Sequence, residues 1–245
     1  MRKFGLIGYP LGHSFSKKYF SDKFVKEGIN ECDYELYPLT DINQLDNLLE
    51  QEPQLEGLNV TIPYKESVIL HLDDLSEEAK AIGAVNCIKL QNGRRIGYNT
   101  DAFGFHQSIK PFLEPHHDRA LILGTGGAAK AAAYVLKKIG IDVIYVSRNP
   151  KDPNEVNYAA LNDLIIRYHK LIINTTPLGT YPAVDVCPDI PYEFLTPEHF
   201  VVDLVYNPEK TLFLQKAESQ QAMILNGHTM LVQQAEKSWT IWNNL

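Results

Sequence analysis

Cysteine is scarce in this sequence, which argues against a disulfide-stabilised protein. The three residues Cys32, Cys87 and Cys187 are widely spaced, and none belongs to a C-x-x-C or Cys/His pattern. An odd number of isolated cysteines is also unlike a zinc site. We therefore expect no metal site and a reducing compartment.

Long apolar runs and an excess of positive charge are also missing. No uninterrupted apolar run approaches the roughly 18 residues that span a bilayer. The basic pair Arg2-Lys3 precedes an apolar stretch too short for a signal peptide. Lys and Arg total 23 against 30 Asp and Glu, a net charge of -7, so no general field attracts a phosphate backbone. We expect a cytoplasmic protein with no nucleic-acid or membrane partner.

What is present suits an α/β protein. The 245 residues, 44% hydrophobic and 22% charged, are enough for one large domain or two modest ones. Short apolar runs alternate with helical patterns, which is typical of mainly parallel sheets. Strands are expected at residues 4–9, 34–38, 55–62, 85–90, 95–98, 121–123, 143–147, 171–174 and 200–205. The two at 85–90 and 95–98 flank the turn signal Asn92-Gly93. Helices are expected at residues 16–27, 42–50 and 228–242, with the boundary between two halves near Phe103 to Glu114.

A glycine-rich segment follows the expected strand at 121–123. Gly124-x-Gly126-x-x-Ala129 lies between that strand and an Ala-rich helix reaching about Ile139, the context that a dinucleotide fingerprint requires. Glycines permit a tight turn and close approach to a pyrophosphate, whose charge a helix N-terminus stabilises. The segment predicts a dinucleotide site, although an ordinary Gly-rich turn would show the same pattern.

The end of the next strand indicates which dinucleotide is bound. An NAD site usually has Asp or Glu there, whereas this chain has Ser147-Arg148-Asn149, with Lys151 shortly after. An acid would repel a 2′-phosphate, and a guanidinium can pair with it through two hydrogen bonds. NADP is therefore predicted, the alternative being that Arg148 is a solvated residue at a strand end.

Several polar residues of the first half have an ordinary structural interpretation when taken singly. Within the expected strand at 55–62, Asn59 and Thr61 alternate with apolar residues and face the opposite side. Lys65, just after Pro63, would by itself be a solvated loop lysine. Three further residues could simply cap helices: Ser14, Ser16 and Asp101.

Ordered segments along essentially the whole chain resemble the shikimate dehydrogenase family. In the first half they are Gly5-Leu6-Ile7-Gly8-x-Pro10-x-x-His13-Ser14-x-Ser16, Gly57-Leu58-Asn59-Val60-Thr61-Ile62-Pro63-Tyr64-Lys65, Gly83-Ala84-Val85-Asn86 and Gly97-x-Asn99-Thr100-Asp101. Besides the Gly124 loop, those of the second half are Asn174-Thr175-Thr176-Pro177-x-Gly179, Asp203-x-x-Tyr206-Asn207-Pro208 and Met230-Leu231-Val232-x-Gln234-Ala235.

The resemblance implies two α/β domains with the active site in the cleft between them. The N-terminal substrate domain would comprise residues 1–104, joined by a returning C-terminal helix at residues 227–245. A doubly wound Rossmann domain at residues 105–226 would bind NADP. The implied reaction is reversible hydride transfer between NADPH and the ring ketone of 3-dehydroshikimate, giving shikimate in aromatic amino-acid biosynthesis.

The resemblance also implies residue roles. Lys65 matches the family's catalytic lysine, and Asp101 matches the acid that pairs with the same region of the substrate. Reduction of a ketone puts negative charge on its oxygen, so a proton donor such as Lys65 is needed there. The expected substrate-binding residues are Ser14, Ser16, Asn59, Thr61, Lys65, Asn86, Asp101, Tyr206 and Gln234. The expected NADP-binding residues are Gly124, Gly126, Gly127, Ala128, Ser147, Arg148, Thr175, Val205, Gly227 and Met230.

The sequence departs from the family pattern at three places. Lys17, Phe20 and Ser21 replace the usual Pro-x-x-His-Asn after Ser16; Ser147-Arg148-Asn149 replaces Asn-Arg-Thr but keeps the arginine; and Gly227-His228-Thr229-Met230 replaces Gly-Leu-Gly-Met. Two alternatives stay open: a dehydrogenase that also accepts quinate, and a nucleotide-binding regulator without catalysis. The expected assembly is a monomer or a homodimer.

Overall fold

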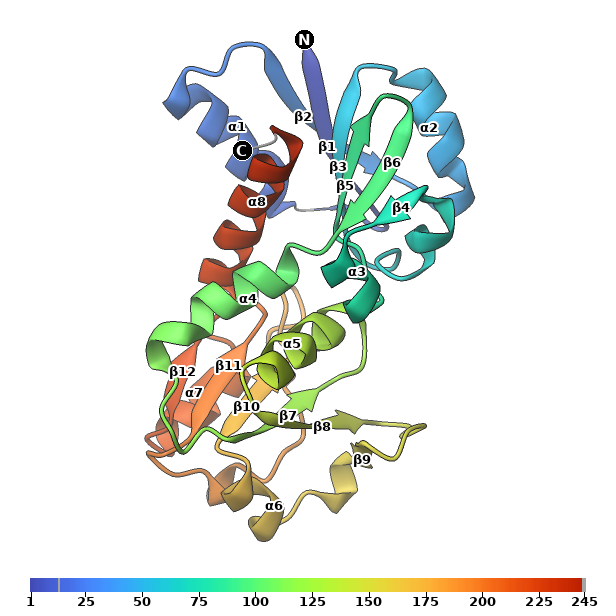
Figure 1. Cartoon of the computed structure of the whole chain (residues 1–245). Helices are drawn as coiled ribbons and strands as arrows, with labels where there is room; N and C mark the ends of the chain where they lie inside the picture. Colours follow the sequence, from blue (N-terminus) through green and yellow to red (C-terminus); the bar gives the residue numbers. More distant parts are fainter. Residues whose placement is uncertain (13, 244–245) are drawn as a thin grey trace. The chain divides into compact units, whose positions relative to one another are not determined.

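The computed structural model describes residues 1–12 and 14–243, so His13 lies outside the described residues. The chain forms two compact units (Figure 1). Unit 1 comprises Met1–Thr100 and the C-terminal segment from Ala235, and unit 2 comprises Asp101–Gln234. The chain therefore passes from unit 1 to unit 2 between Thr100 and Asp101. It returns to unit 1 between Gln234 and Ala235, inside the last helix.

Unit 1 is built on a six-stranded sheet in the order β2-β1-β3-β5-β6-β4. Its strands are β1 (Arg2–Gly8), β2 (Cys32–Pro38), β3 (Leu55–Val60), β4 (Asp74–Leu75), β5 (Cys87–Gln91) and β6 (Arg94–Tyr98). Strand β1 is parallel to both β2 and β3, whereas β5 is antiparallel to β3 and β6. Strand β4 pairs in parallel with β6, so the expectation of mainly parallel sheets is confirmed. The antiparallel pairs come from the expected β5–β6 hairpin, whose turn residues Asn92 and Gly93 both have positive φ.

The helices of unit 1 join the strands in sequence. They are α1 (Phe15–Glu27), η1 (Ile42–Gln44), α2 (Leu45–Gln51), η2 (Ser67–His71) and α3 (Glu77–Ile82). Helix α1 ends at Glu27, and its C-cap Gly28 adopts the left-handed conformation that glycine tolerates best. The segment from Asp74 to Ile82, with β4 and α3, has structure that the sequence patterns did not predict.

Unit 2 contains a fully parallel six-stranded sheet in the order β12-β11-β10-β7-β8-β9. The strands are β7 (Arg119–Leu123), β8 (Asp142–Ser147), β9 (Glu155–Asn157), β10 (Leu171–Asn174), β11 (Phe200–Asp203) and β12 (Met223–Leu225). The helices are α4 (Asp101–Ile109), η3 (Lys110–Phe112), α5 (Gly127–Lys138), η4 (Tyr158–Ala160), α6 (Asp163–Tyr168), η5 (Tyr192–Phe194) and α7 (Leu212–Ser219). The strand order reverses direction between β7 and β10, which is the doubly wound Rossmann arrangement.

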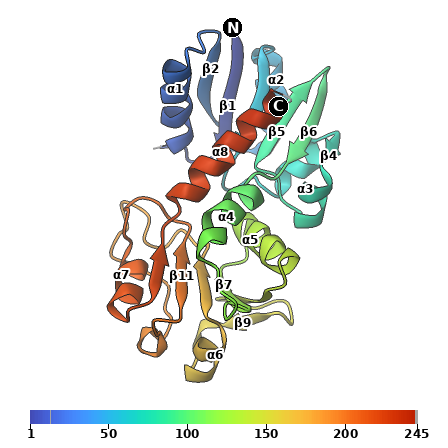
Figure 2. The ribbon, with the colours of Figure 1, turned by 60° about the vertical axis from the view of Figure 1, so that its left-hand side comes forward.

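Helix α8 (His228–Trp242) has the predicted bounds, and its second half packs within unit 1. There it lies beside α1 (Figure 2) and presents Ala235, Ser238 and Trp242 to the interior. The Trp242 indole N–H donates to the Ile88 carbonyl at 3.0 Å. A Cβ at Gly57 on β3 would lie 2.2 Å from that indole nitrogen, so this close contact requires glycine. The predicted return of the C-terminal helix is confirmed.

No helix among the described residues is both long and apolar enough to cross a membrane. All three cysteines are free thiols.

Candidate active site

The loop between β1 and α1 carries the two serines predicted to bind substrate. Ser14 is the N-cap of α1, yet its side chain makes no capping hydrogen bond. Its hydroxyl oxygen is buried and has no partner among the residues that the structure describes. Because a buried hydroxyl without a partner costs free energy, this arrangement suits a site that a polar ligand completes. Ser16, the second residue of α1, is buried.

The turn after β3 holds Thr61 and Lys65. The Thr61 main-chain N–H donates to the Ile7 carbonyl at 2.9 Å, and the Val85 N–H donates to the Lys65 carbonyl at 2.7 Å. These bonds fix the backbone of the turn to β1 on one side and to the segment before β5 on the other. The side chains of Thr61 and Lys65 are partly exposed. The main chain at Lys65 is therefore held near the carboxyl ends of β1 and β3.

Asn86, just before β5, is buried and closely paired with Thr100. Its Oδ1 accepts from the Thr100 N–H at 2.6 Å, and its Nδ2 donates to the Thr100 Oγ1 at 2.9 Å. These bonds fix the chain immediately before Asp101, which is the first residue of α4 and itself buried. A carboxylate at that position is stabilised by the helix N-terminus.

Asn59 on β3 was predicted to bind ring hydroxyls, and its amide is engaged inside unit 1. Its Oδ1 accepts from the Tyr34 phenol at 2.8 Å. Its Nδ2 donates to the Ser238 Oγ at 2.9 Å and to the Asn86 carbonyl at 3.3 Å. Both amide hydrogens therefore have partners within the protein.

In unit 2, α4 and α8 approach closely. A Cβ at Gly104 on α4 would lie 2.5 Å from the Met230 carbonyl oxygen and 3.0 Å from the main-chain nitrogen of Gln234. The Gln234 side chain is buried, and its amide donates to the Leu231 carbonyl at 2.9 Å. Tyr206 follows β11 and is partly exposed.

The Gly124 loop joins β7 to α5, as the fingerprint predicts. Gly124 has a φ of 109°, and a Cβ there would lie 2.8 Å from the Thr175 hydroxyl, so a glycine is required. Gly126 is the N-cap of α5, with no atom within 4 Å of the place where a Cβ would be. The first N–H groups of α5, including those of Gly127 and Ala128, have no partner within the helix. An open helix N-terminus with this loop fits a pyrophosphate.

The other predicted NADP residues follow neighbouring strands at the same edge of the unit 2 sheet. Strands β8 and β10 both pair with β7, so Arg148 and Thr175 flank the Gly124 loop. The Arg148 side chain is exposed, and its carbonyl accepts from the Asn157 amide at 2.9 Å. The remaining predicted residues lie along this edge or at the start of α8: Ser147, Val205, Gly227 and Met230. The Gly227 N–H donates to the Val205 carbonyl at 3.1 Å.

The sequence patterns singled out no role for Asp203, at the end of β11. It is fully buried and accepts hydrogen bonds from the Asn174 amide at 2.9 Å, the Val205 N–H at 3.0 Å and the Thr211 hydroxyl at 2.5 Å. Burial raises the pKa of Asp203 to about 6, against the lowering effect of these three bonds. Asp203 thereby joins the loops that follow β10 and β11. The feature of the sequence that could have identified Asp203 is its place at the start of the Asp203-x-x-Tyr206 segment.

The sequence patterns also predicted no role for Tyr34 or Ser238. Each fits the ordinary pattern of the amphipathic strand or helix in which it lies. Their polar atoms are visible only once β2, β3 and α8 are brought together.

The predicted residues therefore form two groups, each within one unit. Unit 1 holds Ser14, Ser16, Asn59, Thr61, Lys65 and Asn86. Unit 2 holds Asp101, Tyr206, Gln234 and all ten predicted NADP-binding residues. Among the described residues, no group of three His, Cys, Asp or Glu side chains is arranged to hold a metal ion.

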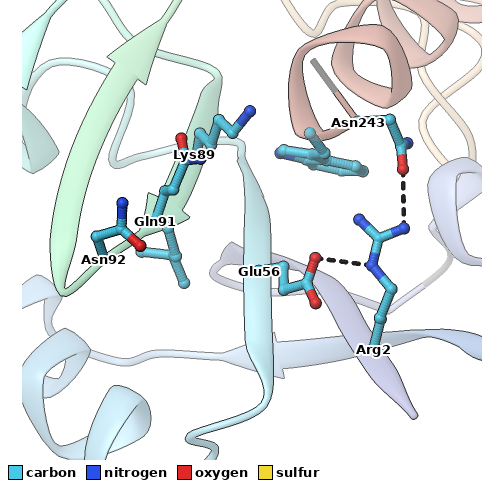
Figure 3. A pocket seen from close by; sticks show the side chains of 8 residues that line it. Arg2, Glu56, Lys89, Gln91, Asn92 and Asn243 are labelled. Atoms are coloured by element: carbon cyan, nitrogen blue, oxygen red, sulfur yellow. Dashed lines mark hydrogen bonds and ion pairs between the residues drawn. The ribbon is translucent and has the colours of Figure 1, made fainter. Parts of the chain in front are cut away.

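A separate polar pocket lies at the opposite end of the unit 1 sheet, where β1 and β3 begin (Figure 3). In it Arg2 binds Glu56 at 2.7 Å and the Asn243 side chain at 2.8 Å. The buried Lys89 donates to the Ile241 carbonyl at 2.8 Å. None of the predicted site residues lines this pocket.

A parallel doubly wound sheet with a glycine loop, joined to a second α/β unit with a lysine at its strand ends, defines the class of two-domain dinucleotide-binding proteins. Residues 6–88 match the family model described as the shikimate dehydrogenase substrate binding domain. The shikimate dehydrogenase (NADP(+)) of Clostridium beijerinckii is 39% identical over 251 residues, covering 99% of this chain and 92% of that protein. The chain belongs to the shikimate dehydrogenase family.

Solved structures agree with this membership. The shikimate 5-dehydrogenase of Thermus thermophilus, solved in complex with NADP(H) and shikimate, has a TM-score of 0.87 and 32% identity, covering 100% of this chain and 94% of that chain. The ligand-free 5-ketofructose reductase of a Gluconobacter species has a TM-score of 0.85 and 27% identity, covering 100% and 93%. The fold is therefore shared by proteins named for different substrates.

Proposed function

We propose that the protein catalyses the reversible, NADP-dependent oxidation of shikimate to 3-dehydroshikimate, in aromatic amino-acid biosynthesis. The observation that carries the proposal is the buried, unpartnered Ser14 hydroxyl at the same end of unit 1 as Lys65 and Asn86. The family membership and the glycine loop of unit 2 support it. Shikimate carries a carboxylate and ring hydroxyls, and such a ligand needs a polar site of this kind.

Substrate recognition is assigned to the predicted polar residues. Ser14 and Ser16 bind the carboxylate, and Tyr206 approaches the same side. The ring hydroxyls bind Thr61, Asn86, Asp101 and Gln234, with Asn59 contributing at the same strand end. A buried polar site of this type discriminates strongly, because a ligand without the matching hydroxyls leaves the protein groups unpaired.

Lys65 and Asp101 are assigned the proton transfer. NADPH, when bound, supplies the hydride that reduces the ketone carbon. Lys65 donates a proton to the ketone oxygen in that direction and accepts it in the reverse direction. Asp101 orients the substrate hydroxyl and the Lys65 ammonium, and shares the proton with it.

The NADP-binding residues follow the edge of the unit 2 sheet. Gly124, Gly126, Gly127 and Ala128 hold the pyrophosphate at the N-terminus of α5. Ser147 and Arg148 bind the 2′-phosphate side. The nicotinamide side is lined by Thr175, Val205, Gly227 and Met230. The guanidinium of Arg148 favours NADP over NAD because it has an anionic partner only in the former.

Two functional domains are proposed on the same basis. Residues 1–104 and 227–245 form the substrate domain, and residues 105–226 form the NADP domain. The packing of α8 from Ala235 onward within unit 1 supports the two-segment substrate domain. Free thiols at all three cysteines support a cytoplasmic location. A monomer or a homodimer, with no nucleic-acid partner, remains the proposed assembly.

A steady-state assay of the purified protein with shikimate and NADP, followed by NADPH absorbance, tests the function. We expect turnover with shikimate and NADP and much weaker activity with NAD. Comparable turnover of quinate would instead favour the broader dehydrogenase. The likeness to a 5-ketofructose reductase makes 5-ketofructose with NADPH a useful third substrate. Binding of NADPH without turnover of any of them would favour a non-catalytic regulator.

A further inference from the structure

We propose that Asp203 is a positioning residue for the nicotinamide half of the cofactor. Its buried carboxylate ties together three segments of unit 2 that carry proposed nicotinamide contacts: the loop after β10, the turn after β11 and the start of α8. The inference rests on the proposed function, because it concerns how the assigned NADP site is held in place. Asp203 itself is assigned no contact with the cofactor.

The carboxylate of Asp203 is bonded on both of its oxygens. Asp203 ends β11 and is fully buried. Its Oδ1 accepts from the Asn174 amide at 2.9 Å and from the Val205 N–H at 3.0 Å. Its Oδ2 accepts from the Thr211 hydroxyl at 2.5 Å. Hydrogen bonds to a charged acceptor are stronger than neutral ones, and a buried donor that loses its acceptor costs free energy. One side chain therefore fixes donors from three separate segments.

The bond to Asn174 orients the loop after β10. Because the Asn174 Nδ2 is directed to Asp203, the Asn174 Oδ1 is directed to the loop. There it accepts from the Thr176 N–H at 3.0 Å and from the Thr176 hydroxyl at 2.6 Å. Thr175 lies between these two residues, and its own hydroxyl donates to the Leu123 carbonyl at 2.7 Å. Through Asn174, Asp203 thus holds the main chain on both sides of Thr175.

The bond to Val205 holds the turn after β11, which contacts the segment that leads into α8. The Val205 carbonyl accepts from the Gly227 N–H at 3.1 Å. A Cβ at Gly227 would lie 2.1 Å from the Leu204 carbonyl oxygen, so the two segments are in direct contact. Gly227 immediately precedes α8, which carries Met230 in its first turn. Asp203 therefore also supports the second group of proposed nicotinamide contacts.

The third bond, to Thr211, supports a different part of unit 2. Thr211 is the N-cap of α7, and its hydroxyl oxygen also accepts from the Leu214 N–H at 3.3 Å. None of the predicted NADP-binding residues lies on α7. Removal of this bond therefore weakens the same buried cluster without releasing a proposed nicotinamide contact, which separates a loss of stability from a loss of positioning.

Two substitutions of Asp203 separate its hydrogen bonds from its charge. Asp203→Ala removes every acceptor and leaves the Asn174 and Val205 donors buried without a partner. Asp203→Asn keeps one oxygen, which suffices for both donors because they share Oδ1. The new amide nitrogen then faces Thr211, whose hydroxyl can accept as well as donate. A positioning role therefore predicts that asparagine replaces Asp203 and that alanine does not.

The test is the binding of two ligands to each purified protein, measured by isothermal titration calorimetry at pH 8. Burial raises the pKa of Asp203 to about 6, so the parent carboxylate is ionised at that pH. The ligands are NADPH and adenosine 2′,5′-bisphosphate, which has the 2′-phosphate and the adenosine but no nicotinamide.

Asp203→Ala should raise the Kd for NADPH about threefold to tenfold, the range for one hydrogen bond, and leave the Kd for adenosine 2′,5′-bisphosphate at the parent value. Asp203→Asn should bind both ligands as the parent does. Three results would overturn the proposal: an unchanged Kd for NADPH in Asp203→Ala, an equal rise for both ligands, or an equal rise in the two variants.

Thr211→Val is the matched control, because it removes the third bond and keeps the shape of the side chain. It should lower the urea midpoint and leave both Kd values unchanged. A rise in its Kd for NADPH as large as that of Asp203→Ala would show that lost stability is sufficient, and would also overturn the proposal.

If Asp203→Ala does not fold by circular dichroism, Asn174→Ala tests the β10 loop with the same two ligands. NADPH binding at the parent Kd in that variant overturns the proposal, and a rise for NADPH alone supports it. A parent protein that binds NADPH without turning over shikimate would refute the proposed reaction and not the role of Asp203.

Discussion

A ketone that accepts a hydride develops negative charge on its oxygen, so a proton donor contributes mainly to the transition state. Lys65→Met keeps most of the side-chain length and removes the charge. We expect kcat to fall by about 10²-fold to 10⁴-fold, with a comparatively small change in KM for shikimate. Steady-state kinetics on protein shown to be folded provide the measurement.

Asp101→Asn serves as the comparison for that variant, because its carboxylate is assigned to the substrate as well as to the lysine. It should lower kcat and raise KM for shikimate together. If Lys65→Met turned over shikimate within a few-fold of the parent rate, Lys65 would not be the proton donor.

The proposed cofactor choice also depends on one residue. Arg148 is exposed just after β8, and its charge is proposed to pair with the 2′-phosphate of NADP. Arg148→Ala should raise KM for NADPH by roughly tenfold to a hundredfold, the loss of a charge-assisted contact of about 1.5 to 3 kcal/mol. KM for NADH should hardly change. Equal weakening toward both cofactors would mean that Arg148 supports the loop rather than the phosphate.

At the scale of elements, the packing of α8 on β3 makes a specific demand at Gly57. A Cβ there would meet three atoms of the Trp242 indole at 2.2 to 2.5 Å, so the ring must move. Gly57→Ala should destabilise unit 1 by about 1 to 3 kcal/mol, the usual range for overpacking a core. Both tryptophans, Trp239 and Trp242, lie in α8 and pack in unit 1. Urea unfolding followed by tryptophan fluorescence therefore reports on unit 1, the unit that contains Gly57.

Gly12→Ala is the control for that measurement. A Cβ at Gly12 meets no atom within 4 Å, and the residue does not need a positive φ. Its unfolding midpoint should stay at the parent value or rise slightly. A Gly57→Ala protein as stable as Gly12→Ala would show that α8 is not packed on β3 in this way.

At the scale of the whole molecule, stability should depend on pH through buried histidines of unit 2. Burial lowers the pKa of His117, His169 and His199 below the usual 6.5. His199 is fully buried, with Nδ1 accepting from the Thr196 N–H at 2.9 Å and Nε2 facing the Ile166 carbonyl at 3.0 Å. A proton on Nδ1 would break the first bond.

Because the unfolded chain binds protons more readily at these sites, their contribution is present above about pH 6.5 and is lost as pH falls. Each histidine can lower the free energy of unfolding by up to about 1.4 kcal/mol per pH unit in that window. The raised pKa of Asp203, about 6, acts in the opposite direction below pH 6. Asp203 is present in both His199→Asn and the parent, so its contribution cancels when the stabilities of the two proteins are compared at each pH.

Urea unfolding followed by circular dichroism between pH 8 and pH 5.5 is the measurement. We expect a shallower loss of stability in His199→Asn than in the parent, while tryptophan fluorescence of unit 1 serves as the internal reference. Parallel pH curves for the two proteins would exclude His199 as a contributor.

The sequence by itself determined the parts of the molecule that depend on local patterning. The bounds of β10 and α8, the hairpin turn at Asn92-Gly93 and the glycine loop before α5 all follow from neighbouring residues, because helix period, turn conformation and strand hydrophobicity are local properties. The family motifs indicated the function for the same reason, since each motif is a short run in the sequence. Residues such as Lys65 and Arg148 can be named from those runs alone.

Tertiary structure alone decided how those local pieces share their polar atoms. Tyr34, Asn59 and Ser238 are far apart in the chain, and each could equally be a solvated or core residue in its own segment. Their hydrogen bonds exist only because β2, β3 and α8 meet in unit 1. Likewise, Asp203 is recognisable as the link between two loops only when β10 lies beside β11. A buried hydrogen bond between distant segments depends on the position of both partners, and no periodicity in either segment encodes that position.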